Sequence, residues 1–379
     1  MSEHTTPSPE PENEHYPIEP RYHPIHKIPR KIYDFLASSK LAMGLLVAIL
    51  VCCVVGVTVW RGAEAGRIIF GTLWFNGILV LLVINVACCF FGRIWGRRVT
   101  LISLGMILFH LSFVAILLGV IYNSLFCFRG NIRLTEGEIL SSSDPASYDG
   151  FDKGRFFSFS RLRGDAALVR VHTDFKIGGE YKRVAYEVAV GERADRKQGL
   201  VYITNKLSHH GVDYFNDREG YSILFALSDR SGKPLYAGYG PLQSIPQKDS
   251  GFIYTTGFKE GNTVIAMPVD FPPAPETARF AFQPTYTPSK LKEREGEVEF
   301  RLYPLQEMLD LAKPFVKGKT TIGKPLSVGE YLLEAKEVRY WAVMTVRYEP
   351  GKPIVLASLW VGLAGMLLTT VGRMLRKQK

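Results

Sequence analysis

The stretch VTLISLGMILFHLSFVAILLGVIYNSLFCF, residues 99–128, decides the fold of this chain. Its thirty residues contain one side chain that can carry a charge, His110. Because roughly 20 helical residues cross the hydrocarbon core of a bilayer, the stretch predicts a membrane-spanning helix, over about 101–123, with residues to spare. His110 then lies well inside the membrane, where an ionisable side chain is costly and needs either a partner or a task.

Two interpretations of His110 are open. Neutral imidazole is a natural ligand for a metal or a haem iron. Alternatively, the ring forms a hydrogen bond to a neighbouring helix and has a structural role. Ser103 lies seven residues before His110 and therefore on nearly the same face, while Gly105, Ser112 and Gly119 allow close contact with another helix. We therefore expect His110 to face protein rather than lipid.

Further uncharged runs are also long enough to span a membrane. They are Leu41–Trp60, Ile68–Gly92 and Pro353–Gly372. We therefore expect three helices within 41–128, at about 41–60, 68–92 and 101–123, and a fourth over 353–373. The first apolar run begins at Leu41 and is too long for the apolar core of a signal peptide, so we expect no cleavable signal.

The formal net charge of +10 gathers largely beside the predicted spans, which argues for a membrane partner and against a nucleic acid. Basic residues precede the first span, follow the second and follow the fourth. They are Lys27, Arg30, Lys31 and Lys40, then Arg93, Arg97 and Arg98, and then Arg373, Arg376, Lys377 and Lys379. By the positive-inside rule these clusters are cytoplasmic. The sequence thus predicts a multi-pass protein of the cytoplasmic (inner) membrane, with both termini inside and residues 129–352 on the periplasmic or extracytoplasmic side.

Residues 129–352 consist of short alternating segments, such as RVAYEVAVGE, YSILFALSD and EVEFRLYPL, separated by Gly, Pro, Asp and Asn clusters. This pattern is typical of β-sandwiches and barrels. The predicted fold is therefore a membrane protein with four transmembrane α-helices, three N-terminal and one C-terminal, and a large β-rich extracytoplasmic domain between the third and the fourth.

The ends of the chain have different characters. Residues 1–27 are rich in Pro, Glu and His and predict a disordered cytoplasmic tail. Residues 28–40 mix apolar and basic side chains, as in a short helix that lies on the inner membrane surface. Residues 374–379 form a basic cytoplasmic tail.

The motifs exclude several kinds of enzyme. The five cysteines all lie in or beside the predicted spans, and no C-x-x-C is present, so the chain is not itself a thiol–disulfide oxidoreductase. It has no phosphate-binding loop, no G-x-S-x-G and no H-E-x-x-H, and we assign no catalytic residue. The adjacent histidines His209 and His210, before Gly211, are candidate ligands of haem or a metal, or simply belong to a solvated turn.

Several stretches resemble the ResB family, the cytochrome c biogenesis proteins of the System II pathway. They are FLASSKLAMGLL (35–46), GTLWFNGILVLLVINVACC (71–89), FHLSFVAILLGVIYNSLFCFRGNIRLTEGE (109–138), NKLSHHGVDYFND (205–217) and VRYEPGKPIVLASLWVGLAGMLLTTVGR (346–373). Their order and spacing carry the resemblance more than any one of them. Lys206 stands where the family often has proline, and Glu349 where it often has aspartate.

The resemblance implies a membrane subunit that carries haem across the membrane and presents it for covalent attachment to apocytochrome c. In this family a histidine in a membrane helix is thought to ligate haem in transit, and His110 occupies the matching position. Haem would be bound transiently and without a covalent bond. Arg129 and Arg133, just outside the third span, are candidates to meet its propionates, or are plain interfacial anchors.

The same resemblance implies partners. The covalent chemistry would belong to a second membrane subunit with a tryptophan-rich haem-handling loop, and this chain would be a non-autonomous subunit of a cytochrome c haem lyase complex. Apocytochrome c is a partner, and a thioredoxin-like thiol reductase is a further candidate. An alternative function is a cofactor-free, membrane-tethered scaffold whose β-rich domain binds an assembly partner. A transporter is disfavoured, because four spans with one internal ionisable residue offer little of a pathway.

Overall fold

The computed structural model describes residues 30–60, 62–94, 100–182, 184–246, 252–260, 263–289, 294–305 and 313–377. The predicted tail 1–27 lies outside the described residues, as does the end of the basic tail at 378–379. The chain divides into two units, which we describe separately. The helical unit comprises Met1–Arg61, Leu73–Leu118 and Ala357–Lys379, and the β unit comprises Gly62–Thr72 and Gly119–Leu356.

The helices confirm the prediction of four membrane-spanning segments. They are α1 (Arg30–Leu36), α2 (Ser39–Thr58), α3 (Ala63–Ala65), α4 (Leu73–Ile94), α5 (Leu101–Phe126) and α6 (Lys352–Lys377). Among them α2, α4, α5 and α6 are long and apolar enough to cross a membrane. The helix expected from about residue 68 begins at Leu73, because Gly66–Phe70 forms a π-helical turn that Gly71 closes with a hydrogen bond from its N–H to the Gly66 carbonyl (2.6 Å).

Small residues at seven-residue intervals line the contact between α5 and α6, where every second helical turn returns to the same face. They are Gly105, Ser112 and Gly119 on α5, Gly351 immediately before α6, and Ser358, Gly365 and Gly372 on α6. The backbones approach closely enough that a Cβ atom on Gly365 would lie 2.7 Å from the carbonyl oxygen of Gly105. The glycine spacing therefore selects α6 as the neighbour of this face of α5.

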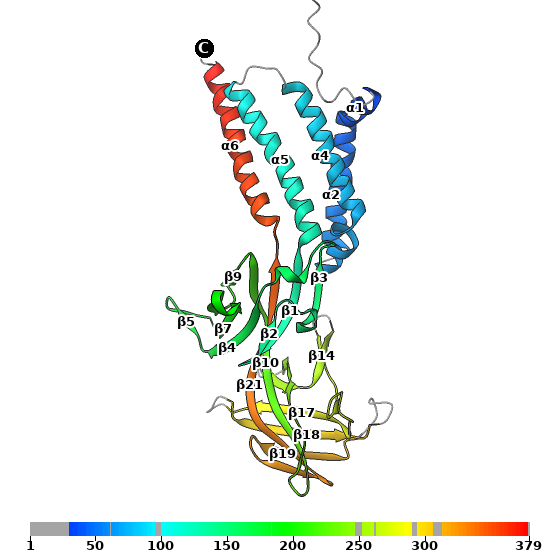
Figure 1. Ribbon diagram of the computed structural model, residues 1–379, viewed down its shortest axis with the longest axis vertical. Coiled ribbons are helices and arrows are strands. Elements are labelled where there is room, and N and C mark those ends of the chain that lie inside the picture. Colours follow the sequence, from blue (N-terminus) through cyan, green and yellow to red (C-terminus); the bar gives the residue numbers. More distant parts are fainter. Residues whose placement is uncertain are drawn as a thin grey trace, which may run out of the picture. The chain divides into compact units, whose positions relative to one another are not determined.

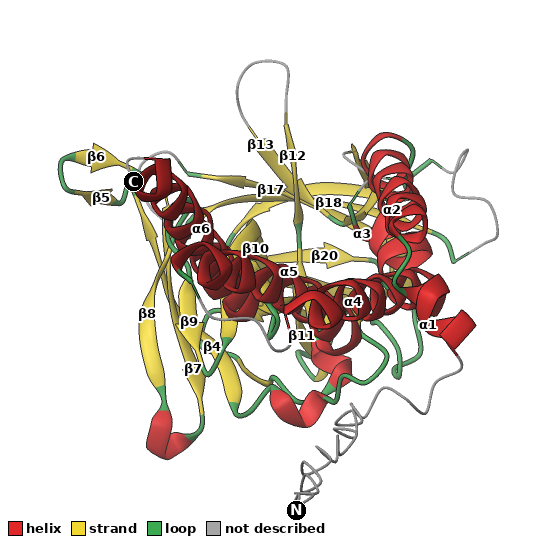
Figure 2. Cartoon of the chain, turned by 90° about the horizontal axis from the view of Figure 1, so that it is seen from above, coloured by secondary structure: helices red, strands yellow, loops and turns green. Residues whose placement is uncertain are grey.

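The opposite side of α5 carries His110. At about 100° per residue, a position five residues after Gly105 and two before Ser112 lies roughly opposite the glycine face. Its neighbour is α4, where the ring of Phe90 stacks on the imidazole. Figure 1 shows α5 between α4 and α6, and Figure 2, seen from above, shows α6, α5 and α4 in a row with α2 beside α4. The expectation that His110 faces protein agrees with this arrangement.

The short helix α1 is tied to α4 by side-chain hydrogen bonds. The Asn85 amide donates to the Leu36 and Ser38 carbonyls at 2.6 and 3.1 Å, and the Tyr33 hydroxyl donates to the Cys88 carbonyl at 2.9 Å. Asn85 thus bonds to another segment, as expected of an amide in an apolar span. The segment 28–40 accordingly contributes one helix that packs on α4.

The described residues of the β unit form five sheets. The seven-stranded sheet has the order β11-β10-β21-β1-β3, and in addition β20 pairs with β21 and β9 pairs with β10. The six-stranded sheet has the order β12-β13-β17-β18-β19, and β16 pairs with β17. The four-stranded sheet has the order β2-β4-β7-β8. Two small hairpins, β5-β6 and β14-β15, complete the unit. The paired strands of the described residues run antiparallel, as in β10 against β21 and β1 against β21.

The strand bounds follow the alternating segments of the sequence. The strands are β1 (Phe128–Thr135), β2 (Ile139–Ser141), β3 (Tyr148–Lys153), β4 (Asp165–Thr173), β5 (Lys176–Ile177), β6 (Glu180–Tyr181), β7 (Val184–Gly191), β8 (Lys197–Val201), β9 (Leu207–His209), β10 (Val212–Asp229), β11 (Pro234–Pro241), β12 (Gln243–Pro246), β13 (Phe252–Thr255), β14 (Gly257–Glu260), β15 (Thr263–Ala266), β16 (Val269–Phe271), β17 (Phe280–Pro288), β18 (Gly296–Tyr303), β19 (Val316–Thr321), β20 (Pro325–Val328) and β21 (Tyr331–Tyr348).

Two hydrophobic cores share one face of the long strands β10 and β21. Tyr214 of β10 lies in the first core with side chains of the four-stranded sheet, and Phe225 lies in the second core with side chains of the six-stranded sheet. These two positions differ by an odd number of residues, which would place them on opposite faces of a regular strand. A bulge between Asn216 and Arg218 shifts the alternation by one residue, so the side chains of Tyr214 and Phe225 point to the same face of the sheet. The paired strands β10 and β21 therefore contribute to both cores.

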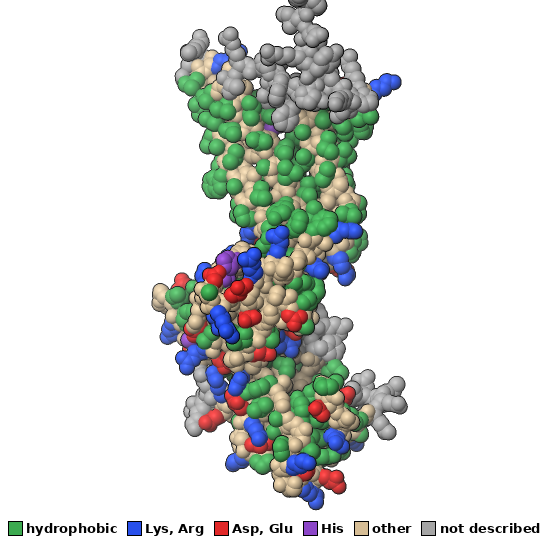
Figure 3. Space-filling model, viewed as in Figure 1, with side chains coloured by type: hydrophobic (Ala, Val, Ile, Leu, Met, Phe, Trp, Pro, Cys, Tyr) green, Lys and Arg blue, Asp and Glu red, His purple; other side chains and the backbone are tan. Residues whose placement is uncertain are grey.

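The surface character differs between the helices and the strands. Hydrophobic side chains cover the helices in Figure 3, whereas blue and red charged side chains gather over the strands. Exposed apolar residues on the helices include Leu50 and Val54 of α2 and Trp360 and Leu367 of α6. Apolar side chains exposed at this density are expected on helices surrounded by lipid or by another membrane protein. The structure therefore supports a membrane protein with a β-rich domain between its third and fourth spans.

Candidate functional site

The His110 imidazole has a defined tautomer. Its Nδ1 lies 2.8 Å from the carbonyl oxygen of Met106, one helical turn earlier. Because a carbonyl oxygen accepts hydrogen bonds and does not donate them, Nδ1 carries the proton. The other nitrogen, Nε2, then has a lone pair, and among the described residues we find no group that bonds to it. A neutral imidazole with a free Nε2 is the form that ligates iron or another metal.

Aromatic rings hold this imidazole in place. The Phe90 ring of α4 stacks on it with a centroid distance of 4.4 Å and an interplanar angle of 20°, and the Phe109 ring meets it edge-on at 5.5 Å and 89°. His110 is nine residues from the start of α5, which at 1.5 Å per residue is about 14 Å along the helix. The ring is therefore half-buried among apolar side chains and well inside the span.

The two candidate arginines lie on the β unit, on the face of β1 opposite the first core. Arg133 forms an ion pair with Asp149 (Nη2 to Oδ2, 2.7 Å), and its guanidinium lies 5.4 Å from the centroid of the Trp341 ring. Arg129 is exposed, two positions before Asn131 on the same face. The charge of Arg133 is thus already balanced by a carboxylate, whereas Arg129 offers an exposed cation.

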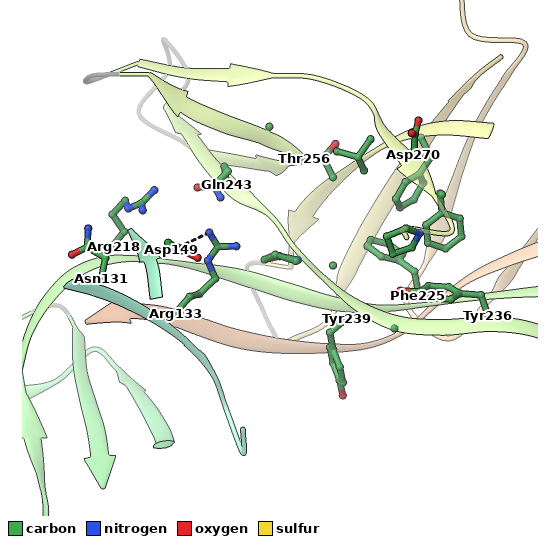
Figure 4. A pocket seen from close by; sticks show the side chains of 18 of the residues that line it. Asn131, Arg133, Asp149, Arg218, Phe225, Tyr236, Tyr239, Gln243, Thr256 and Asp270 are labelled. Carbon is green, nitrogen blue, oxygen red and sulfur yellow. Dashed lines mark hydrogen bonds and ion pairs between the residues drawn. The ribbon is translucent and has the colours of Figure 1, made fainter. Parts of the chain in front are cut away.

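Arg133 lines a cavity of about 830 Å³ in the β unit. Figure 4 shows Asn131, Arg133, Asp149, Arg218 and Gln243 at one end of this cavity and Phe225 and Tyr236 at the other. One end is therefore polar, with charges of both signs, and the other end combines aromatic rings with the Asp270 carboxylate. Sequence analysis does not reveal this cavity, because its lining comes from strands far apart in the chain.

The two candidate histidines of the β unit come together with a carboxylate. His210 forms a hydrogen bond to Asp195 through Nε2, and His209 Nε2 lies 3.7 Å from the same carboxylate oxygen, Asp195 Oδ2. The hydrogen bond from His210 is the main cause that lowers the pKa of the Asp195 carboxyl. Sequence analysis identified the histidines and missed Asp195, since nothing local marks one carboxylate among many. Both histidines lie in the β unit, whereas His110 lies in the helical unit.

These features define a class of protein: a polytopic membrane protein with a half-buried imidazole in its third span and a two-core β unit before its fourth. Residues 94–161 match the family model of the ResB-like family. The matched segment contains α5 with His110, and β1 with Arg129 and Arg133. The match is consistent with the resemblance found in the sequence and indicates a general role in cytochrome c biogenesis. A comparison with curated proteins found no match.

Proposed function

We propose that this chain is a subunit of a System II cytochrome c synthase complex, which helps to carry haem across the membrane and presents it for attachment to apocytochrome c. The observation that carries the proposal is the free Nε2 of His110, held by the Met106 carbonyl on its other nitrogen. Such a ring can take one axial position of a haem iron while apolar helices surround the porphyrin. The ResB-like match over residues 94–161 includes this histidine.

A second membrane subunit completes this site. The helices α6, α5 and α4 form a row rather than a closed bundle, so the two broad faces of the row are open to another membrane protein (Figure 2). We infer that the partner carries a tryptophan-rich haem-handling loop and performs the covalent attachment. This chain has five tryptophans, spread from Trp60 to Trp360, and no such loop.

The β unit then serves the protein partners. We propose that it lies on the periplasmic or extracytoplasmic side with both termini in the cytoplasm, as the basic clusters suggest. Unpaired edges of its sheets offer backbone groups to an unfolded apocytochrome. On β1, Arg129 is exposed, whereas Arg133 is already paired with Asp149. A thioredoxin-like reductase would keep the apocytochrome thiols reduced.

The test measures haem on the full-length protein purified in detergent from haem-replete cells. We expect an absorption band of bound haem in the unsubstituted protein and its loss in His110→Ala. The control is His172→Ala, which removes a histidine that is paired with Glu187 (3.1 Å) in the β unit and should keep the haem. In His110→Gly, added imidazole should restore the band, because it can occupy the space of the missing ring.

Two results would oppose the proposal. An unchanged haem spectrum in His110→Ala would remove His110 from the mechanism. A protein that carries no haem in any preparation, but still loses its partner when residues 129–352 are deleted, would favour the cofactor-free scaffold instead.

A further inference from the structure

A second cluster of ligand atoms lies in the β unit, at one end of the four-stranded sheet. Asp195 belongs to a short 3-10 turn, Arg193–Asp195, that connects β7 to β8. His209 is the last residue of β9, and His210 and Gly211 form the two-residue turn to β10, with His209 paired to Val212. Both turn residues have positive φ angles, 47° at His210 and 76° at Gly211. This turn type matches the twist of a hairpin and places the two imidazoles next to each other.

The three side chains converge on one point. Their ligand atoms all lie within 4.8 Å of one another. His209 Nε2 is 3.7 Å from Asp195 Oδ2, and the two imidazole centroids are 4.1 Å apart. Around a tetrahedral ion with ligand bonds of about 2.0–2.2 Å, neighbouring ligand atoms are roughly 3.4 Å apart. The spacing of His209 and Asp195 is close to that value, and His210 needs to move slightly away from the carboxylate.

The His209 ring has a buried nitrogen that can accept a ligand. Its side chain is 12% exposed, and its Nε2 is buried with no hydrogen-bond partner among the described residues. A buried polar atom without a partner is destabilising, so the fold leaves this nitrogen in an unfavourable state unless something binds there. Gly191 makes room for the ring, since a Cβ atom at this position would lie 2.6 Å from Nε2.

We propose that Asp195, His209 and His210 form a binding site for a divalent transition metal, with Zn²⁺ as the best match. Two imidazole nitrogens and one carboxylate oxygen are a three-ligand set that Zn²⁺ uses, and they leave a fourth position open. Harder ions such as Mg²⁺ and Ca²⁺ prefer all-oxygen ligands and fit this set poorly.

The bound ion would fasten the β7–β8 turn to the β9–β10 turn. The Asp195 and His210 side chains are 62% and 58% exposed, so the open fourth position faces solvent and can take a water molecule or an exchangeable ligand. The ion would take the place of the hydrogen bond between His210 and Asp195. This inference does not depend on the proposed function, because the cluster lies in the β unit and involves no haem.

The test measures Zn²⁺ binding to the full-length protein in detergent, by calorimetry and by the absorption spectrum of Co²⁺ used as a substitute. In every protein tested, the four histidines of the N-terminal tail are replaced by asparagine, because these histidines could bind metal on their own. These are His4, His15, His23 and His26. We expect one Zn²⁺ per chain, with an affinity that falls as the pH drops below about 6.5, where free imidazole gains a proton.

Three variants separate a metal site from a simple ion pair. His209→Asn and Asp195→Asn should each weaken Zn²⁺ binding by at least about tenfold, the scale seen when even outer-shell partners are lost. His172→Asn, a histidine paired with Glu187 elsewhere on the unit, should leave the affinity unchanged. Since Asp195 is exposed, its variant should fold normally even if His209→Asn does not. No saturable binding in the parent protein, or equal affinity in parent and Asp195→Asn, would overturn the proposal.

Discussion

Gly105 lies at the close approach of α5 and α6, and alanine there should weaken the helical unit. A Cβ atom on Gly105 would lie 2.6 Å from the carbonyl oxygen of Gly365 and 2.7 Å from the backbone nitrogen of Thr369. Ordinary contact begins at 3.4 Å, so the first of these contacts is about 0.8 Å too short. The Cβ would also meet the Thr369 hydroxyl, which can rotate, but the other two neighbours are backbone atoms that cannot, so the helices must separate instead.

The expected magnitude follows from a comparison with a second glycine. Overpacking typically destabilises by about 1–3 kcal/mol, while alanine favours a helix over glycine by about 1 kcal/mol. Gly77 of α4 has nothing within 4 Å of its added Cβ, so Gly77→Ala should show the helix preference alone. Gly105→Ala should therefore be less stable than Gly77→Ala by about 1–3 kcal/mol.

The assay follows the helical circular dichroism of both purified variants in the same detergent during heating or titration with denaturing detergent. Gly365→Ala, on the facing helix, should behave like Gly105→Ala, because its Cβ would lie 2.7 Å from the Gly105 carbonyl oxygen. If Gly105→Ala and Gly77→Ala unfold together, the small residues do not set the spacing of α5 and α6.

Three further predictions concern the β unit. Glu136 is 6% exposed and accepts a hydrogen bond of 2.9 Å from a buried backbone N–H. Glu136→Ala should therefore lower the free energy of unfolding, measured by denaturant titration, by about 2–3 kcal/mol. The exposed Glu138→Ala is the control and should lower it by at most about 1 kcal/mol. Trp341→Phe leaves two carbonyls without their indole donor, at 3.0 and 3.1 Å, and should speed hydrogen exchange in β21 and reduce stability by about 1–2 kcal/mol. Burial raises the pKa of the Asp213 carboxyl, but the hydrogen bonds and the ion pair with Lys206 outweigh burial and lower the pKa overall. The ionised Asp213 therefore contributes stability at neutral pH, and this contribution is lost as the pH falls through the lowered pKa. Asp213→Asn should thus melt at a lower temperature at pH 7 and at the same temperature near pH 2, and an equal deficit at both values would contradict this assignment.

The membrane-spanning segments could be predicted from the sequence because length and apolar character are local properties. The third span and His110 emerged from thirty residues without any knowledge of their neighbours. The start of α4 was less accessible, since the π-helical turn at Gly66–Phe70 depends on the hydrogen bond that Gly71 makes back to Gly66. The glycine spacing identified a face of α5 for close helix contact, whereas the stacking of His110 on Phe90 of α4 lies on the other side of the helix and was not visible in the sequence.

The β unit shows where local patterns stop being informative. Alternation identified segments such as Tyr221–Asp229 as strands, yet it could not show that two cores share β10 and β21, because that depends on pairing between positions more than a hundred residues apart. The same limit explains Asp195. Two neighbouring histidines are visible in the sequence, whereas the carboxylate that joins them comes from a different turn and is positioned by the four-stranded sheet. Haem binding and the partners stay predictions.

The pairing of β1 with β21 has a consequence for how this protein is assembled. The chain enters the β unit through one of these strands and leaves through the other, and Phe128 stands directly opposite Tyr348. Neighbouring strands are about 5 Å apart, so the start and the finish of this long excursion are adjacent. Such an insert is self-contained: evolution or an engineer could exchange it, or release it as a separate soluble module joined end to end, without changing the distance that the flanking helices must span.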